Sequence, residues 1–277
     1  MRLTLIILLA MFALVACSQS APSVTAKAPA KNTSGKKYDA ETAFQPSNAV
    51  MTEIDDLLVR AEASDKLALI VMGANWCHDS RGFVKTLNNK RLQEVLDDRY
   101  EVLLVDVGYL QRGRKVIERF GIPIIYGTPT VLVVDPRSEL LINRDDMHRW
   151  RDAARIDVNE AIEYFTRMAK PAALLEAQKA VTADSPVLIA LYAEINAFEM
   201  TQAERIYQGF ARLAPMLAMD RAERPEAFNE EWDQVRDLRY QITDDLAALR
   251  SEAKRRVASG ETDIALTYPD YPPFSWE

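Results

Sequence analysis

The sequence predicts an α/β domain with a mixed central sheet, followed by a region made only of helices. Helix-like and strand-like segments alternate between residues 48 and 170, which is typical of a sheet covered by helices. After Pro171, strand-like segments almost disappear and apolar residues recur at helical spacing. The composition, with 48% hydrophobic and 27% charged residues, is that of an ordinary globular chain. The length allows one medium domain and a smaller one.

Each element of the α/β domain is predicted from its periodicity and length. Helices are expected where apolar residues recur every three or four positions, and strands where a short apolar run is bounded by polar or turn residues. The strand 67–72 is apolar throughout, which suits burial on both faces of a sheet. The expected elements are, in chain order, a helix over 50–63, a strand over 67–72, a helix over 79–98, a strand over 100–106, a helix over 114–120, strands over 130–134 and 139–142, and a helix over 158–168.

The C-terminal region is predicted to hold three or four helices. One is expected after Ala172, one or two over 187–217, and a long charged one over 230–257, with breaks at Pro215 and Pro225. No clean repeat period is present, so we expect a packing extension of the first domain rather than tetratricopeptide-like helix pairs. The aromatic, proline-rich tail 268–277 is expected either to dock on a partner in extended form or to pack along its own domain.

The N-terminus is predicted to carry a targeting signal. A basic start and an apolar run over 3–16 end in Leu14-Val15-Ala16-Cys17, which resembles a bacterial lipoprotein signal with its lipobox. The resemblance implies a diacylglyceryl group on the Cys17 sulfur and cleavage before it; the alternative is an ordinary secretory signal. A helix over 3–16 would be about 21 Å long, short of the roughly 30 Å hydrocarbon core, so a spanning anchor is disfavoured.

The lipoprotein resemblance also implies a location. In a Gram-negative cell, Ser18 stands where an aspartate often retains lipoproteins at the inner membrane, so we expect attachment to the outer membrane, facing the periplasm. Residues 18–47 are rich in small and polar residues and in proline, which is typical of a flexible tether. A tether of this length would have an r.m.s. span of roughly 30 Å.

The chemistry is expected at Trp76-Cys77-His78-Asp79-Ser80, which follows the first strand and opens a helix. Unpaired N–H groups and the helix dipole at that position favour thiolate over thiol. With Cys17 lipidated, Cys77 is the one free cysteine of the mature chain, so no intramolecular disulfide can form. The alternative is that Cys77 is a small, semi-buried core residue without a redox role.

Together with Gly127-Thr128-Pro129-Thr130, this motif resembles the thioredoxin superfamily, in which a Trp-Cys-x-x-Cys turn faces a cis-proline loop. The resemblance covers 48–170 and implies a thioredoxin-like α/β fold with an all-α C-terminal extension. It also implies a cis Pro129, with Thr128 presenting backbone groups to a peptide or thiol substrate. The alternative for Pro129 is an ordinary trans proline at the start of a strand.

The departures from this family matter as much as the match. Ser80 stands at the position of the second, resolving cysteine, so an outside thiol would have to resolve any mixed disulfide. The Ser80 hydroxyl can still donate a hydrogen bond to the Cys77 thiolate. The preceding strand offers Val71 and Met72 where reductases of the family often carry a buried aspartate. Both losses point away from a general dithiol reductase.

The neighbours of the thiol are open to two interpretations. A protonated His78 would further favour the thiolate, or it is an exposed loop histidine without a role. Asp79 opposes the thiolate by its charge, or acts as a helix cap or first-turn dipole partner. The only other histidine is His148, so no metal site and no cofactor are expected.

Two functions of different classes remain. The first is an envelope-tethered monothiol protein acting in thiol–disulfide exchange or mixed-disulfide capture, with Cys77 and Ser80 as its reactive residues. Trp76, His78, Thr128 and Pro129 would line its substrate site. The second is a non-catalytic thioredoxin-like binding or assembly module, with its partner surface on the helical half. A Cys77 sulfur sealed under Trp76 and the proline loop would favour the second.

The expected partners follow from charge and chemistry. They are protein or small-molecule thiols and disulfides, the membrane through lipid on Cys17, and a protein partner of the C-terminal helices. A net charge of -7 without a long basic stripe argues against nucleic acid. The expected segments are a signal peptide with its lipobox over 1–17, a tether over 18–47, a thioredoxin-like domain over 48–170 and a helical domain over 171–277.

Overall fold

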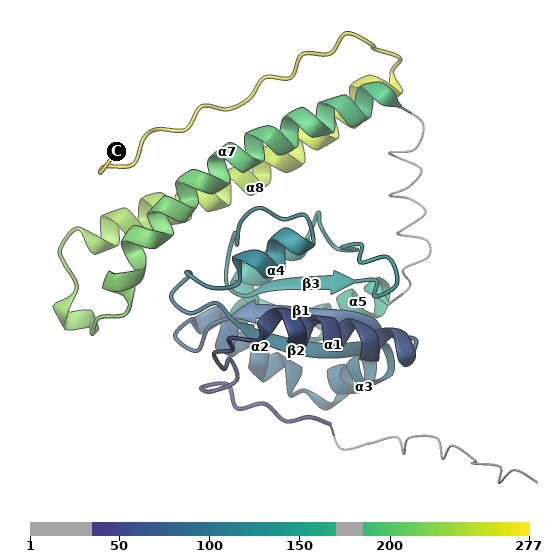
Figure 1. Cartoon of the computed structure of the whole chain (residues 1–277), viewed down its shortest axis with the longest axis vertical. Coiled ribbons are helices and arrows are strands. Elements are labelled where there is room, and N and C mark those ends of the chain that lie inside the picture. The colour runs from purple at the N-terminus through teal and green to yellow at the C-terminus, as the bar shows by residue number, and fades with distance from the viewer. Residues whose placement is uncertain (1–34, 170–184) are drawn as a thin grey trace, which may run out of the picture. The chain divides into compact units, whose positions relative to one another are not determined.

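The computed structural model describes residues 35–169 and 185–277 (Figure 1). The predicted lipobox with Cys17, and the helix expected after Ala172, lie outside the described residues. Within the described ranges, no helix is both long enough and apolar enough to cross a membrane. Residues Gly35–Glu277 form one compact unit.

The centre of the fold is a three-stranded mixed sheet in the order β2-β1-β3. The middle strand β1 (Leu67–Gly73) pairs in parallel with β2 (Tyr100–Asp106) and antiparallel with β3 (Thr130–Val134). Every residue of β1 is buried, as its continuous apolar run predicted. The α/β class with a mixed sheet is therefore confirmed, as is a helical C-terminal region.

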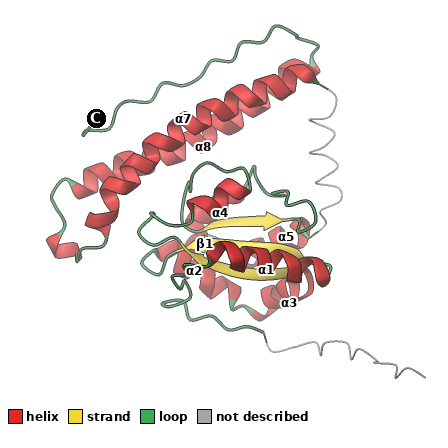
Figure 2. Cartoon of the chain, viewed as in Figure 1, coloured by secondary structure: helices red, strands yellow, loops and turns green. Residues whose placement is uncertain are grey.

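Helices cover both faces of this sheet (Figure 2). Alternate residues of β1 belong to two different core clusters: Ala68, Ile70 and Met72 to one, and Leu67, Leu69 and Val71 to the other. The first face is covered by α1 (Val50–Ala63) and α4 (Arg114–Arg119), and the second by α2 (His78–Leu87), α3 (Lys90–Arg99) and α5 (Val158–Met168).

The single helix predicted over 79–98 is two helices. The break lies at two adjacent asparagines: Asn88 ends α2, and Asn89 caps α3 by accepting hydrogen bonds from the N–H groups of Arg91 and Leu92. Asparagine at these positions competes with the helical backbone for hydrogen bonds, which the periodicity of the apolar residues does not reveal.

The fourth strand predicted over 139–142 does not form. The segment pairs with the edge of β3 only locally. An isolated bridge joins Leu141 to Val134, and the N–H of Ile142 donates to the carbonyl of Val133 at 2.8 Å. The edge of β3 is completed by the side chain of the buried Asn143, whose Oδ1 accepts from the N–H of Val133 at 2.8 Å and whose Nδ2 donates to the carbonyl of Val131 at 2.8 Å. A side-chain amide thus does part of the pairing that a strand was expected to do.

Part of the predicted tether is folded. Phe44 is 1% exposed and packs in the second core cluster. Its backbone N–H donates to Asn75 Oδ1 at 3.0 Å, and Asn75 Nδ2 donates back to its carbonyl at 2.9 Å. The small-residue composition of 18–47 concealed these anchors, which join the segment to the loop that carries Cys77.

The C-terminal region is built on two long antiparallel helices, α7 (Pro186–Leu217) and α8 (Phe228–Ala258), which lie side by side (Figure 1). The short η2 (Arg221–Glu223) lies between them, and η1 (Met147–Arg155) precedes α5. Pro215 lies inside the last turns of α7 rather than breaking it. The first core cluster continues from the sheet into both helices, in line with a packing extension.

The aromatic tail packs along its own helices, which was one of its two expected fates. Tyr271 donates to Asp245 of α8 at 2.8 Å, and Arg205 of α7 donates to the carbonyl of Pro272 at 2.9 Å. The ring of Phe198 lies 5.0 Å from that of Tyr268.

Candidate functional site

Cys77 is the N-cap residue of α2. Its backbone is extended, with φ -83° and ψ 124°, and its carbonyl accepts from the N–H of Arg81 at 3.1 Å. The turn before it is closed by the Cys77 N–H, which donates to the carbonyl of Ala74 at 3.1 Å. Arg81 also donates to the carbonyl of Asn75 at 2.9 Å, so both ends of this turn are fixed to α2. The sequence therefore places the thiol at the helix start, as predicted.

The two motifs found in the sequence meet at the sulfur. The Thr128–Pro129 peptide bond is cis, as the resemblance implied. Cys77 Sγ lies 3.2 Å from the carbonyl oxygen of Thr128, to which the thiol donates, and 3.2 Å from Thr128 Oγ1, which donates to the sulfur. Cys77 as a residue is half-buried rather than fully buried.

Ser80 is buried under this turn. It is 0% exposed, and its Oγ accepts from the N–H of Ala74 at 3.3 Å. The hydrogen bonds of the Cys77 sulfur among the described residues are with Thr128, so a donation from Ser80 to the thiolate stays a prediction. A Cβ at Gly73 would lie 2.5 Å from Phe44 Cζ and 2.8 Å from Ser80 Oγ, so the close packing under the turn requires glycine.

The other predicted residues of the motif, Trp76, His78 and Asp79, each lie in different surroundings. Trp76 is half-buried, donates from its indole to the carbonyl of Gly108 at 2.7 Å, and stacks on Tyr109 at 6.3 Å. His78 is exposed. Asp79 lies in the first turn of α2 and accepts from the backbone N–H of Ala154 at 3.0 Å, which ties this helix to η1.

The structure adds residues of α8 to the surroundings of the thiol. Trp232 meets Trp76 edge-to-face, with ring centroids 6.2 Å apart. Arg151, which follows Trp150 in η1, donates to Thr243 at 3.1 Å and lies 3.8 Å from the centre of the Tyr240 ring. Trp232 falls within the long charged helix predicted over 230–257, but sequence reasoning could not tell that its ring meets Trp76.

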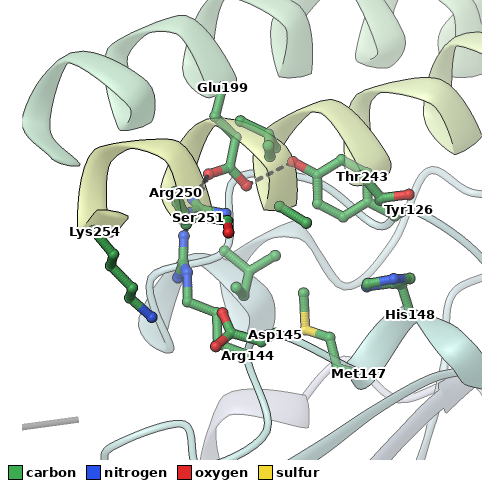
Figure 3. A pocket seen from close by; sticks show the side chains of 13 residues that line it. Tyr126, Arg144, Asp145, Met147, His148, Glu199, Thr243, Arg250, Ser251 and Lys254 are labelled. Carbon is green, nitrogen blue, oxygen red and sulfur yellow. Dashed lines mark hydrogen bonds and ion pairs between the residues drawn. The ribbon is translucent and has the colours of Figure 1, made fainter. Parts of the chain in front are cut away.

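A buried ion cluster joins the C-terminal helices to the sheet domain (Figure 3). Glu199 of α7 is 2% exposed and accepts from Tyr126 at 2.6 Å, from Arg250 of α8 at 2.7 Å and from Arg144 at 3.3 Å. We call Glu199, Tyr126, Arg144 and Arg250 the Glu199 cluster. Burial and the nearby Glu199 carboxylate raise the pKa of Tyr126 well above its usual value, which keeps it a hydrogen-bond donor.

The Glu199 cluster lines a cavity of about 270 Å³. Its wall continues along α8 through Thr243, Ser251 and Lys254 (Figure 3). His148 also lines it, and burial followed by the charge of Arg151 lowers the pKa of His148. Glu199 was detectable in the sequence, since it falls four residues after Ile195, where the apolar stripe of α7 would continue.

Among the described residues, no group of three or more His, Cys, Asp or Glu side chains could hold a metal ion. The arrangement around Cys77 therefore offers one thiol, a hydroxyl and a carbonyl at hydrogen-bond distance, and an aromatic wall. These groups can orient a thiolate and a sulfur-containing partner, without providing a second thiol.

Comparison with known proteins gives little further guidance. A scan against protein-family models finds no match, and no curated protein matches the chain. Among solved structures, the chain is similar to a disulphide isomerase from Xylella fastidiosa Temecula1, with 26% sequence identity over 45% of this chain and 93% of that chain, at a TM-score of 0.41. The candidate roles of Cys77 and its neighbours therefore rest on the geometry of this chain alone.

Proposed function

We propose that this chain is a thioredoxin-like monothiol protein that exchanges or captures thiols and disulfides through Cys77. The observation that supports it is a half-buried thiol at the start of α2 with two hydrogen bonds to Thr128. The helix start favours the thiolate, which is the attacking species in disulfide exchange.

The reaction begins when the Cys77 thiolate attacks one sulfur of a disulfide. A sulfur–sulfur bond forms to Cys77, the original bond breaks, and the other half leaves as a thiolate. Ser80 cannot attack the resulting mixed disulfide, so an outside thiol must release the captured group. The protein is thus suited to monothiol exchange, isomerisation or capture rather than to a dithiol cycle.

We further propose that the chain is a lipoprotein of the bacterial envelope, held by lipid on Cys17 at the outer membrane. Mass spectrometry of the mature N-terminus tests this. A diacylglyceryl-modified Cys17 at the first position is expected, and Cys17→Ser should leave the precursor unprocessed. A mature chain that begins at an unmodified residue after Cys17 would contradict the proposal.

The decisive test of the thiol chemistry uses the full mature protein and a small neutral disulfide, bis(2-hydroxyethyl) disulfide. Intact-mass measurement should show one added hydroxyethylthio group on the wild type and on Lys85→Gln, a control at an exposed residue of α2. Cys77→Ser should add none. If the folded wild type gains no group at millimolar reagent, Cys77 is not a reactive thiol.

A non-catalytic binding module is the second candidate. The packing of Trp232 against Trp76 favours it, because α8 occupies part of the face beside the thiol. In that case, Cys77→Ser should retain every protein that the wild type retains after cross-linking in cell envelopes. Loss of those proteins only under reducing conditions, and only when Cys77 is present, would favour the exchange function instead.

A further inference from the structure

The helix η1 contacts both halves of the thiol site. On one side, the backbone N–H of Ala154 donates to Asp79 in the first turn of α2 at 3.0 Å. On the other side, Arg151 packs against Gly127, the residue before Thr128. Because η1 reaches from the helix that carries the thiol to the loop that binds it, its position influences how closely the two approach.

The contact between Arg151 and Gly127 is tight. A Cβ at Gly127 would lie 2.6 Å from the Cβ of Arg151, which is closer than two such atoms approach, and 3.7 Å from its Cδ. The carbonyl of Gly127 also accepts from the hydroxyl of Thr130 at 2.7 Å, which fixes the loop to the start of β3. Arg151 therefore lies directly against the segment that presents Thr128 to the sulfur.

The other end of the Arg151 side chain is held by α8. Its Nη1 donates to Thr243 Oγ1 at 3.1 Å, and its guanidinium lies 3.8 Å from the centre of the Tyr240 ring. The side chain is 16% exposed, and its ion pair with the exposed Asp152 is 3.7 Å long. A cation over an aromatic ring is held more strongly when it is largely removed from water. One side chain thus joins the loop at Gly127 to the C-terminal helix.

The same loop is joined to the C-terminal helices a second time. Tyr126, which precedes Gly127, donates to Glu199 of α7 at 2.6 Å, and Glu199 also accepts from Arg250 of α8 at 2.7 Å. Two consecutive residues of the loop are therefore fixed by separate contacts to the helical region. The next residue, Thr128, is the one that bonds the thiol.

The two hydrogen bonds between Thr128 and the Cys77 sulfur act on different states of the thiol. The thiol donates to the Thr128 carbonyl, and this bond is lost when the proton leaves to water. The Thr128 hydroxyl donates to the sulfur at 3.2 Å, and such a donation is stronger when the acceptor is charged. The placement of the hydroxyl therefore favours the thiolate, which is the species that attacks a disulfide.

We propose that Arg151 is a positioning residue through which the C-terminal helices keep the Thr128 hydroxyl against the Cys77 sulfur and so set the rate of exchange. The inference rests on the proposed exchange function and gives the helical region a role in regulating it. Loss of the contact between Arg151 and α8 frees the loop at Gly127 and withdraws the hydroxyl. The thiol then reacts more slowly with the same disulfide.

The test measures the rate of mixed-disulfide formation with bis(2-hydroxyethyl) disulfide on the full mature protein at neutral pH, by intact mass. Thr128→Val removes the hydroxyl but keeps the branched shape. Loss of a hydrogen bond to a charged group should lower the thiolate population about tenfold. A less stabilised thiolate is a better nucleophile, which recovers about half of that change on a logarithmic scale. We therefore expect Thr128→Val to react about threefold more slowly than the wild type.

Substitutions at either end of the contact with α8 should have the same effect. Arg151→Met keeps the apolar stem against Gly127 but removes the guanidinium, and should react about threefold more slowly than the wild type. Tyr240→Leu removes the ring and should do the same, whereas Tyr240→Phe keeps the ring and should retain the wild-type rate. Arg155→Met removes an exposed arginine of η1 and is the matched control. Thermal unfolding shows whether each variant is folded.

The double variant of Arg151→Met with Thr128→Val separates positioning from other roles. If Arg151 acts by placing the hydroxyl, it has nothing to place once the hydroxyl is gone, and the double variant should react at the rate of Thr128→Val alone. If Arg151 acts through its charge or on the fold in general, the two effects multiply to about ninefold, which overturns the proposal. Should Arg151→Met not fold, Tyr240→Leu takes its place in the same double variant.

The failures are distinguishable. No mixed disulfide in the wild type overturns the exchange function, and with it the inference that rests on it. A wild type that reacts, and an Arg151→Met variant that reacts at the same rate, overturn the role of Arg151 and leave the exchange function standing. An unchanged rate in Thr128→Val overturns the inference as well. A slow Arg151→Met beside an unchanged Tyr240→Leu removes α8 from the explanation and overturns the proposed regulation.

Discussion

Glu199→Gln should destabilise the folded chain strongly although it changes few atoms. The carboxylate is 2% exposed and compensates two guanidinium groups, whose side chains are 18% exposed for Arg250 and 27% for Arg144. Removing one partner of a buried ion pair typically costs about 3–5 kcal/mol. Because both arginines keep some contact with water, the lower end applies, and we expect a loss of about 3 kcal/mol.

Urea unfolding followed by tryptophan fluorescence measures this loss. With a slope of about 2–3 kcal/mol per molar urea, the midpoint should fall by roughly 1 M or somewhat more. Glu204→Gln is the matched control, because Glu204 is an exposed acid on the same helix, 3.7 Å from Arg114; its effect should stay within about 0.5 kcal/mol. A loss below about 1 kcal/mol in Glu199→Gln would refute the idea that this carboxylate stabilises the junction.

Three further outcomes are expected. Ser80→Cys should form an internal disulfide with Cys77, since the two positions share the first turn of α2; two free thiols after oxidation would contradict this. Asn143→Leu should cost about 3 kcal/mol in urea unfolding, because it leaves two buried backbone groups of β3 unpaired; a near-neutral change would refute the edge-pairing role. His148 binds a proton less readily when folded, so its contribution to stability falls as pH drops through 6.5, and His148→Gln should flatten the decline between pH 7 and 5.

The α/β organisation was predictable because it depends on patterns along the chain. The β1 run of seven buried residues and the helix Val158–Met168 agree with the expected periodicity. The prediction of a fourth strand was wrong. Glu139 to Ile142 resembles a strand locally, but the side chain of Asn143 pairs with the edge of β3. Side-chain pairing of that kind depends on three-dimensional proximity, which periodicity does not encode.

Only two parts of the site, the thiol at the helix start and the Thr-Pro loop, were predictable from the sequence. A cysteine at a helix start and a Thr-Pro loop are short local signals, and the structure brings them within 3.2 Å of each other. Trp232 lies more than a hundred residues away in the sequence and appears there as an ordinary member of a charged amphipathic helix. Nothing in the spacing of α8 tells that this side chain meets Trp76 once the helices pack.

The missing second thiol determines how the proposed exchange would turn over. The start of α2 and the hydroxyl of Thr128 would stabilise Cys77 as a leaving thiolate, so an outside thiol that attacks the captured sulfur would release the mixed disulfide. A resolving cysteine is then unnecessary for turnover. Without one, no second thiol among the described residues releases an unsuitable partner by attacking the mixed disulfide. In the proposed exchange, selectivity must therefore come from how the partner binds beside the thiol.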